Sequence, residues 1–354
     1  MTNNNLSREA ETSFHVIPEH LDRFLFEKAS GLFAPDHEAV RANLYAGAAE
    51  VQRYLGTYFP RSFMEGRVLV ARNLSHPAFD AAFRRKSPIR ILDLGSGTGG
   101  FAAGLAWGLR ERGITAPITI QAVDGNEKAL EYQEAMWKTI HQGVAFRPVH
   151  CILPKRDWSL SLMDLEGDFD FVIASKFLVE MLPEPLNSTT GDFEMVPLEF
   201  LTLAEQLLRS PGLAIINELT MSVQIGASAR PFLPELLNRA AYRHAGRQNS
   251  QLRIVLPVPC ALFGRSCDSL DICFQQVAAE VVHSRKPGGD VSKSVPRVWA
   301  TPDLSDKLLK GIGPSEPFTV ASFRDRRNIC IGGCLRRDKT FTIKTRNGFI
   351  LSQG

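Results

Sequence analysis

The chain has 354 residues, of which 44% are hydrophobic and 22% are charged, and its formal net charge is +3. This length can bury a full hydrophobic core and leaves room for one α/β domain with additions. No run of 18 apolar residues occurs, so we expect no membrane-spanning helix, and the small net charge does not by itself indicate nucleic-acid binding. The N-terminal residues show neither a secretory apolar segment nor an Arg-rich transit pattern, so we expect a cytoplasmic protein.

The first part of the chain is predicted to be helical. Apolar residues recur at helical spacing between about residues 19 and 76, and runs of β-branched residues are few there. Aromatic side chains and Arg61 occur within residues 54–65, shortly before the first predicted strand, where they could cover a bound ligand. Packing between helices is the alternative role for each aromatic ring. We therefore treat residues 1–80 as a helical N-terminal region.

A glycine-rich loop follows the first predicted strand, residues 90–94. Gly95, Gly97 and Gly99 stand where the chain turns into the next predicted helix. Glycine allows positive φ and has no Cβ atom, so such a loop lets a ligand contact the backbone. Together with Gly100, the spacing also fits G-x-G-x-x-G, a pattern typical of dinucleotide-binding loops.

The acid before the glycines indicates which ligand the loop binds. Asp93 lies at the mouth of the loop. A carboxylate there would repel the pyrophosphate of a dinucleotide, but it suits the ammonium and sulfonium groups of S-adenosylmethionine. The sequence therefore predicts a methyl donor as the ligand.

A second acid ends the next predicted strand, residues 118–123. Asp124 follows this strand, and a helix is expected over residues 128–140. An acid at this position of a βαβ unit can accept hydrogen bonds from both ribose hydroxyls. The alternative is that Asp124 only caps the following helix. In combination with the glycine loop, the first interpretation is favoured.

Three further strands are predicted at residues 145–152, 169–174 and 213–218, with helical stretches between several of the strands. They complete a doubly wound parallel sheet in an S-adenosylmethionine-binding α/β core over residues 81–252. The exit of the fourth strand is a usual edge of a donor pocket. The predicted cofactor-binding residues are Asp93, Gly95, Ser96, Gly97, Thr98, Gly99, Asp124, Gly125 and Ser175.

Two later segments interrupt the α/β pattern. Residues 184–195 contain Pro185 and an Asn-Ser-Thr-Thr-Gly run, and they are expected to be a flexible surface insertion. After about residue 253 the pattern weakens and most of the cysteines follow. We expect residues 253–354 to be a Cys-containing C-terminal portion that completes the sheet.

The late cysteines suggest a metal site. A cytoplasmic chain has little use for disulfides, so clustering favours a metal ion or an iron–sulfur cluster. Four thiolates are the usual ligands of an iron–sulfur cluster, whereas the C-x6-C-x5-C spacing here is looser than that of zinc knuckles. The alternative is that these cysteines are small core residues. The cysteines concerned are Cys260, Cys267, Cys273, Cys330 and Cys334.

A basic ribbon lies near the C-terminus. Between Arg324 and Arg346 the chain has eight basic residues and two acidic ones. Such a ribbon could follow a phosphate backbone. A solvated hairpin face is the alternative, and it is the favoured one without further context.

Several segments together carry a family resemblance. They are residues 54–74, 91–99, 170–180 and 257–277, together with the basic tail around Cys330. Over most of the chain from about residue 50, the sequence resembles the methyltransferase-like ribosomal small-subunit assembly family of bacteria and mitochondria. The resemblance implies a doubly wound, mainly parallel class I methyltransferase (Rossmann-like) sheet with a helical N-terminal region and a Cys-containing C-terminal addition.

The resemblance also implies partners and a second cofactor. The small ribosomal subunit or its rRNA would be the partner, and S-adenosylmethionine the methyl donor. A [4Fe–4S] cluster would be held by Cys260, Cys267, Cys273 and Cys330, with zinc as the alternative occupant and Cys334 as an alternative fourth ligand. The usual Cys-Pro-His run of the family is replaced here by Val258-Pro259-Cys260, and Phe274 follows Cys273 where a histidine is usual.

No residue of the sequence stands out as the catalytic group. An Asn/Asp-Pro-Pro-aromatic motif, which would orient an exocyclic amine, is absent, and Ser175-Lys-Phe177 stands in its place. Glu180 and Glu218 lie near strand ends and could face a substrate or cap a helix. The sequence thus leaves open a methyltransferase acting on RNA, one acting on a small molecule, and a noncatalytic RNA-binding assembly factor that keeps the cofactor pocket.

Overall fold

The computed structural model describes residues 14–35, 45–84, 88–140, 143–165, 167–183, 190–219, 221, 233–247, 250–257, 261 and 277–310. It also gives the backbone of two short strand pairs, β9 (Val320–Ser322) with β10 (Asn328–Cys330) and β11 (Thr342–Lys344) with β12 (Ile350–Ser352). Within these ranges, no helix has both the length and the apolar composition needed to cross a membrane.

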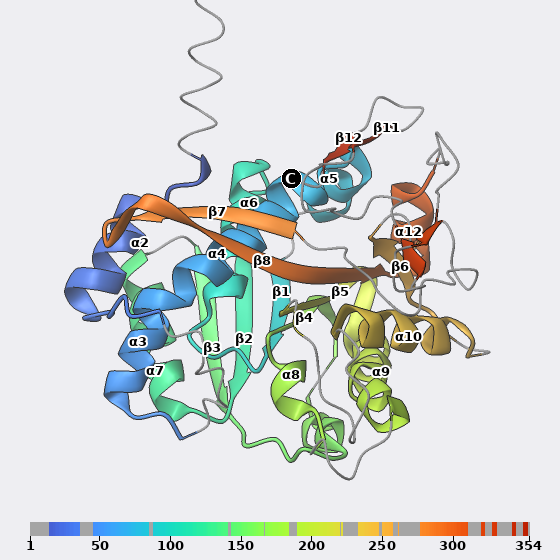
Figure 1. Cartoon of the computed structure of the whole chain (residues 1–354), viewed down its shortest axis with the longest axis horizontal. Helices are drawn as coiled ribbons and strands as arrows, with labels where there is room; N and C mark the ends of the chain where they lie inside the picture. Colours follow the sequence, from blue (N-terminus) through green and yellow to red (C-terminus); the bar gives the residue numbers. More distant parts are fainter. Residues whose placement is uncertain are drawn as a thin grey trace, which may run out of the picture.

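An eight-stranded sheet forms the centre of the molecule, in the order β3-β2-β1-β4-β5-β8-β6, with β7 paired to β8 (Figure 1). The first five strands are parallel, as consecutive βαβ units require. All five agree with the predicted strands, and the order 3-2-1-4-5 is that of a doubly wound Rossmann-like sheet. Their bounds are Ile89–Leu94, Ile118–Asp124, Val144–His150, Phe169–Ser175 and Leu208–Leu219.

Antiparallel strands from the C-terminal portion extend the same sheet. β8 (Lys286–Ala300) pairs with β5, with β6 (Arg253–Leu256) and with β7 (Val277–His283). Figure 1 shows β8 as a long ribbon that crosses the molecule from the β7 hairpin toward β5. Residues 253–256 and 277–300 therefore belong to the central sheet.

Helices cover both faces of the sheet. β4 shows the division, because Phe171 and Ile173 pack into one hydrophobic cluster while Val172 and Ala174 pack into the other, as alternation along a strand requires. The first cluster includes side chains of α6 (Gly100–Glu111), α7 (Glu127–Ile140) and α12 (Pro302–Leu308). The second includes side chains of η3 (Trp158–Leu162), α8 (Leu178–Met181), α9 (Thr190–Leu207) and α10 (Leu233–Ala245).

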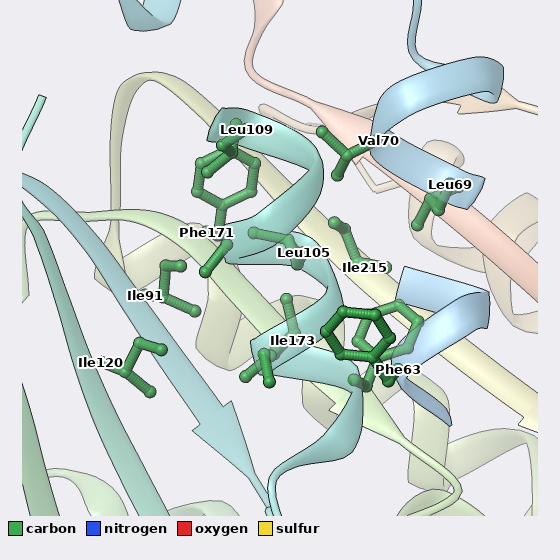
Figure 2. Close-up of a cluster of buried hydrophobic side chains, with 14 of the residues drawn as sticks. Phe63, Leu69, Val70, Ile91, Leu105, Leu109, Ile120, Phe171, Ile173 and Ile215 are labelled. Carbon is green, nitrogen blue, oxygen red and sulfur yellow. The ribbon is translucent and has the colours of Figure 1, made fainter. Parts of the chain in front are cut away.

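The N-terminal region is helical, as predicted. It contains α2 (Glu19–Arg23), η1 (Phe24–Lys28), α3 (Ala48–Thr57), α4 (Phe59–Val68), η2 (Leu69–Asn73) and α5 (Pro77–Phe83). Its apolar side chains share the first hydrophobic cluster with the sheet. Figure 2 shows Leu105 and Leu109 of α6 between the strands on one side and Phe63 and Val70 on the other.

Glycines allow α4 to lie very close to α6. A Cβ atom at Gly66 would lie 2.3 Å from the Phe101 carbonyl oxygen, and one at Gly104 would lie 1.9 Å from the Phe63 carbonyl oxygen. A larger residue at either position would force the helices apart. Since α6 begins directly after the glycine loop, this packing fixes α4 beside that loop.

The prediction of a flexible insertion over residues 184–195 is wrong for its second half. α9 begins at Thr190, and Phe193 is fully buried in the second cluster with Val196 and Phe200. The spacing of these apolar residues is helical. Their burial outweighs the loop preference of the polar run before them, while residues 184–189 lie outside the described residues.

Candidate functional site

A cleft of about 310 Å³ opens at the carboxyl ends of β1, β4 and β5, where open α/β sheets bind ligands. The glycine loop and the start of α6 form one side, named here the loop wall: Asp93, Gly95, Ser96, Gly97, Thr98, Gly100 and Phe101. Segments distant in sequence form the other side, named the assembled wall: Tyr54, Tyr58, Arg61, Ser62, Ser175, Lys176, Val179, Glu180, Leu219, Val291, Ser292 and Lys293.

The loop uses the conformational freedom of glycine at three positions. Gly95, Gly97 and Gly99 have φ angles of 61°, 51° and 79°, in the left-handed region that other residues adopt only at a cost. A Cβ atom at Gly95 would also lie 2.2 Å from the Phe177 ring, and one at Gly99 would lie 2.4 Å from Gln133 Oε1. At Gly97 it would meet no atom of the described residues within 4 Å. The space against Gly97 is therefore open to a ligand.

Asp93 is the acid of the loop wall. It is only 2% exposed and lines the cleft, and its carboxylate has no hydrogen-bond partner among the described residues. Burial raises the pKa of Asp93 well above its usual value, and the charge of Asp124 adds to this effect. A buried carboxylate without a partner is unfavourable, so a cationic ligand group beside Asp93 would be stabilised there.

Asp124 ends β2, and both of its carboxylate oxygens accept backbone hydrogen bonds. The Gly97 N–H donates to Oδ2 at 2.6 Å, and the Asn126 N–H donates to Oδ1 at 2.7 Å. Burial raises the pKa of Asp124, while these two N–H groups and His150 act in the opposite direction. Asp124 thus holds the glycine loop, and α7 is capped by Asn126, whose Oδ1 accepts the Ala129 N–H at 3.0 Å.

Gln133 of α7 supports the same loop. Its Nε2 donates to Ser96 Oγ and to the Gly97 carbonyl oxygen, both at 2.8 Å. Sequence reasoning missed Gln133, because a glutamine on an amphipathic helix has no pattern that distinguishes it from a solvent-facing one. It also missed Asn126, although an asparagine directly before a helix is a recognised capping signal.

Six of the nine predicted cofactor-binding residues line the cleft: Asp93, Gly95, Ser96, Gly97, Thr98 and Ser175. The other three lie beside the loop. Gly99 precedes α6 in the left-handed conformation, Asp124 hydrogen-bonds to Gly97, and the Gly125 carbonyl oxygen lies 3.0 Å from His150 Nε2. The structure therefore brings the predicted set together around one loop.

A buried carboxylate organises the assembled wall. Glu65 of α4 is 2% exposed, and its oxygens accept hydrogen bonds from Lys176 Nζ at 3.1 Å, from Asn217 Nδ2 at 2.8 Å and from Ser292 Oγ. These donors lie after β4, on β5 and on β8. Glu65 therefore ties α4 to three strands at the edge of the cleft, in a network whose partners depend on one another.

Lys176 follows β4 with a φ angle of 59°. This left-handed conformation costs roughly 1–3 kcal/mol for a residue with a side chain. The Lys176 N–H donates to the Asn217 carbonyl oxygen at 2.8 Å, and its ammonium lies 3.0 Å from Glu65 Oε2. Nζ also donates to Ser62 Oγ at 3.0 Å. These contacts hold the strained residue with its ammonium in the cleft wall.

Two tyrosines and an arginine stand at the junction of α3 and α4. The ring centroids of Tyr54 and Tyr58 are 5.1 Å apart, and the Arg61 guanidinium lies 5.9 Å from the Tyr58 centroid. Arg61 Nε donates to Asp290 of β8 at 2.8 Å. Burial raises the pKa of Tyr54 to about 12, with Glu180 adding to the rise, so Tyr54 keeps its proton at neutral pH.

Glu180 and Glu218 have different positions. Glu180 lines the cleft, whereas Glu218 of β5 is fully buried. The Leu178 N–H donates to Glu218 Oε1 at 2.8 Å, and Oε2 has no hydrogen-bond partner among the described residues. Burial raises the pKa of Glu218 to about 8. Glu218 therefore supports the short helix α8, which presents Val179 and Glu180 to the cleft.

The predicted metal ligands and the basic ribbon fall outside the residues whose side chains are described. Only the backbone of Cys330 and of residues 328–330 and 342–344 is given there. In the described part of the chain, no group of three or more His, Cys, Asp or Glu side chains is arranged to hold a metal ion. The cysteine and ribbon hypotheses stay predictions.

No family model and no curated protein matches the sequence. Among solved structures, the chain aligns with TrmN from Thermus thermophilus at 16% identity over 70% of this chain and 53% of that one, with a TM-score of 0.34. A precorrin-6y C5,15-methyltransferase from Geobacter metallireducens aligns at 14% identity over 63% and 85%, with a TM-score of 0.33. A SAM-dependent methyltransferase from Aquifex aeolicus aligns at 13% identity over 68% and 97%, with a TM-score of 0.31.

These alignments concern the fold alone. The fold class itself is given by the strand order and pairing: a doubly wound, mainly parallel Rossmann-like sheet with a helical N-terminal region. The predicted fold class is confirmed.

Proposed function

We propose that the protein is an S-adenosylmethionine-dependent methyltransferase. The observation that carries this proposal is Asp93, a buried carboxylate that faces the cleft and has no hydrogen-bond partner among the described residues. Such a group suits an ammonium or a sulfonium and would oppose a pyrophosphate. The open space against Gly97 leaves room for a ligand to lie on the loop backbone. The residues present therefore fit this donor.

Each part of the loop has a role in the proposal. Asp93 would accept hydrogen bonds from the amino group of the donor, and the backbone around Gly97 would lie against its methionine part. Asp124 would accept hydrogen bonds from the ribose hydroxyls, because a carboxylate has about four acceptor positions and two are used by Gly97 and Asn126. The bound donor supplies an activated methyl group, while the chain positions an acceptor and excludes water.

For the acceptor we propose RNA, in particular the rRNA of the small ribosomal subunit. The family resemblance of the sequence supports this, as do the eight basic residues between Arg324 and Arg346. Tyr54 and Tyr58 stand beside basic residues in the assembled wall, and unpaired bases stack on aromatic rings in such surroundings. A small-molecule acceptor is the second candidate, favoured by the modest cleft of about 310 Å³.

For the second cofactor we propose a [4Fe–4S] cluster, with zinc as the alternative. The support is the late clustering of the cysteines in sequence, together with the family resemblance. The resemblance implies Cys260, Cys267, Cys273 and Cys330 as the ligands. Protein purified without oxygen should be brown and contain iron. Two results together would contradict this proposal. The wild-type protein purified without oxygen would be colourless and free of metal, and the variant with all four cysteines changed to Ser would fold equally well.

Calorimetry with S-adenosylhomocysteine tests the donor site. We expect the wild-type protein to bind, and we expect Asp93→Asn and Asp124→Asn each to weaken binding about tenfold or more, since hydrogen bonds to charged groups contribute about 1.5–3 kcal/mol. Asp164→Asn, a change at an exposed position, is the matched control. Tight binding of NAD, or unchanged affinity in both cleft variants, would overturn the donor assignment.

A transfer assay decides between the acceptors. Labelled S-adenosylmethionine is incubated with the protein and either purified small-subunit rRNA or a small-molecule fraction of cell extract. Label in rRNA supports the first candidate, and label only in the small-molecule fraction supports the second. Donor binding without transfer to either fraction would favour the noncatalytic assembly factor.

A further inference from the structure

The Ser62 hydroxyl has a proton to donate into the cleft. Lys176 Nζ donates to Ser62 Oγ at 3.0 Å, so this oxygen already serves as an acceptor and its own proton is directed elsewhere. None of the described residues accepts that proton. Because Ser62 lines the cleft, a ligand there can accept it.

The Lys176 ammonium brings a positive charge to the same part of the cleft. Among the described residues, Nζ lies 3.0 Å from Ser62 Oγ and 3.1 Å and 3.0 Å from Oε1 and Oε2 of Glu65. Its side chain is 22% exposed, and Lys176 lines the cleft. Glu65 is fixed in turn by Asn217 and Ser292. The ammonium is therefore held at a defined place in the cleft wall, where its positive charge attracts an anionic ligand group.

These donors lie beside the first turn of α6. A Cβ atom at Gly100 would lie 3.0 Å from Ser62 Cβ, and Gly100 and Phe101 both line the cleft. No side chain in the described part of the chain caps the start of α6, so its first N–H groups add positive potential to the same region. The carboxylate of Asp93, for which the described residues provide no hydrogen-bond partner, lies in the loop wall. The cleft thus offers donors for an anion together with an acid for a cation.

We propose that Ser62 and Lys176 form a subsite for the carboxylate of the amino-acid part of the methyl donor, and that Glu65 is the positioning residue for both. The inference rests on the proposed function. Asp93 takes the ammonium of the same amino-acid part, so the two walls together select a zwitterion. The subsite also explains the strained backbone of Lys176, because this conformation places the ammonium where the ligand carboxylate would lie.

Two ligands that differ only in the carboxylate test the subsite. S-adenosylhomocysteine carries both the amine and the carboxylate, whereas S-adenosyl-3-thiopropylamine keeps the amine and lacks the carboxylate. Calorimetry on the wild-type protein should show tighter binding of the first. Ser62→Ala and the charge-balanced double variant Glu65→Gln/Lys176→Met should each weaken S-adenosylhomocysteine about tenfold or more and change the affinity for the amine analogue less than about twofold.

A control variant and the pattern of losses separate the outcomes. Lys138→Met removes an exposed ammonium on α7 and should affect neither ligand. Equal losses for both ligands would show that Lys176 and Ser62 act only through the shape of the cleft, and unchanged affinity for both would show no contact. Either result overturns the subsite. If the wild-type protein binds neither ligand, the proposed function itself fails, whereas equal wild-type affinity for both overturns the subsite alone.

Discussion

The two walls of the cleft have different origins in the chain. The loop wall and its supports come from one continuous stretch, residues 93–133, in which Asp124 and Gln133 hydrogen-bond to the loop. The assembled wall is organised by Glu65, whose partners lie 111, 152 and 227 positions further along the chain. One wall is local in sequence, and the other exists only after folding.

This difference predicts how each wall responds to substitution. The loop wall depends on backbone conformation, so an added Cβ atom disturbs it where it stands. The assembled wall depends on buried charges, and the loss of one partner leaves another charge desolvated and unpaired. We therefore expect the loss of a buried charge that supports the assembled wall to lower folding stability strongly, and changes at Gly97 to act mainly on ligand affinity.

The largest effect is expected at Glu218, which supports the assembled wall. Burial raises its pKa to about 8 from an ordinary 4.5, so the folded state binds this proton more tightly than the unfolded state. The resulting stability is fully present below about pH 4.5 and is lost as the pH rises through 8, by roughly 5 kcal/mol at about 1.4 kcal/mol per pH unit. Glu218→Gln keeps a carbonyl acceptor for the Leu178 N–H and removes the ionisation.

Urea unfolding at pH 5 and pH 9 measures this effect. The free energy of unfolding of the wild-type protein should fall between these pH values by several kcal/mol more than that of Glu218→Gln, and the variant should be the more stable protein at pH 9. Asp93 also has a raised pKa, but it is present in both proteins and cancels in the comparison. If the free energies of unfolding of the two proteins changed in parallel with pH, the raised pKa of Glu218 would be contradicted.

The next effect is expected at Glu65. Glu65→Gln removes the charge that faces the Lys176 ammonium, while the Glu65 side chain is 1% exposed, and breaking a buried pair in this way costs about 3 kcal/mol. Urea unfolding at pH 7 checks the value. Glu134→Gln, which breaks an exposed pair with Lys138 on α7, should change stability by less than about 0.5 kcal/mol. A loss at Glu65 no larger than in this control would show that the network is not a strong constraint.

The same comparison explains what could be predicted from the sequence. β1, the glycine loop, β2 and Asp124 were readable because strand periodicity and turn chemistry act over short distances. The sequence indicates only as one possibility that the N-terminal segment lies over this loop. The close packing depends on Gly66 fitting against a carbonyl group of α6 and Gly104 against one of α4, and this fit exists only once the two helices meet.

The assembled wall could not be predicted for a physical reason. Nothing in the neighbours of Glu65 distinguishes it from a solvated helix residue, because its partners are provided by strands far along the chain. Lys176 is likewise an unusual residue for a left-handed conformation, which favours glycine and asparagine. The prediction of a loop at Thr190 failed for the same reason, because the second hydrophobic cluster that buries Phe193 is assembled from several elements.

A matched glycine pair tests the loop wall. Gly95→Ala combines a positive φ with a clash against the Phe177 ring and should lower the free energy of unfolding by about 2 kcal/mol. Gly97→Ala has the positive φ but open space around the new methyl group, so it should cost about 1 kcal/mol. Yet Gly97→Ala should weaken S-adenosylhomocysteine binding, because its methyl group occupies the ligand space. Normal affinity in a folded Gly97→Ala protein would place the ligand elsewhere.

The smallest effect is expected at the rim of the assembled wall, where Arg61 pairs with Asp290. The side chains are 19% and 24% exposed. Burial alone would raise the pKa of Asp290, but the hydrogen bond and the charge of Arg61 lower it. A double-mutant cycle with Arg61→Met and Asp290→Asn should give a coupling energy of about 1 kcal/mol or less at pH 7, and the coupling should shrink between 0.1 and 1 M NaCl because partly exposed pairs are screened. A salt-independent coupling of about 3 kcal/mol, as large as the stability loss expected for Glu65→Gln, would mean that the rim is as desolvated as the buried network. The distinction between rim and interior would then not hold.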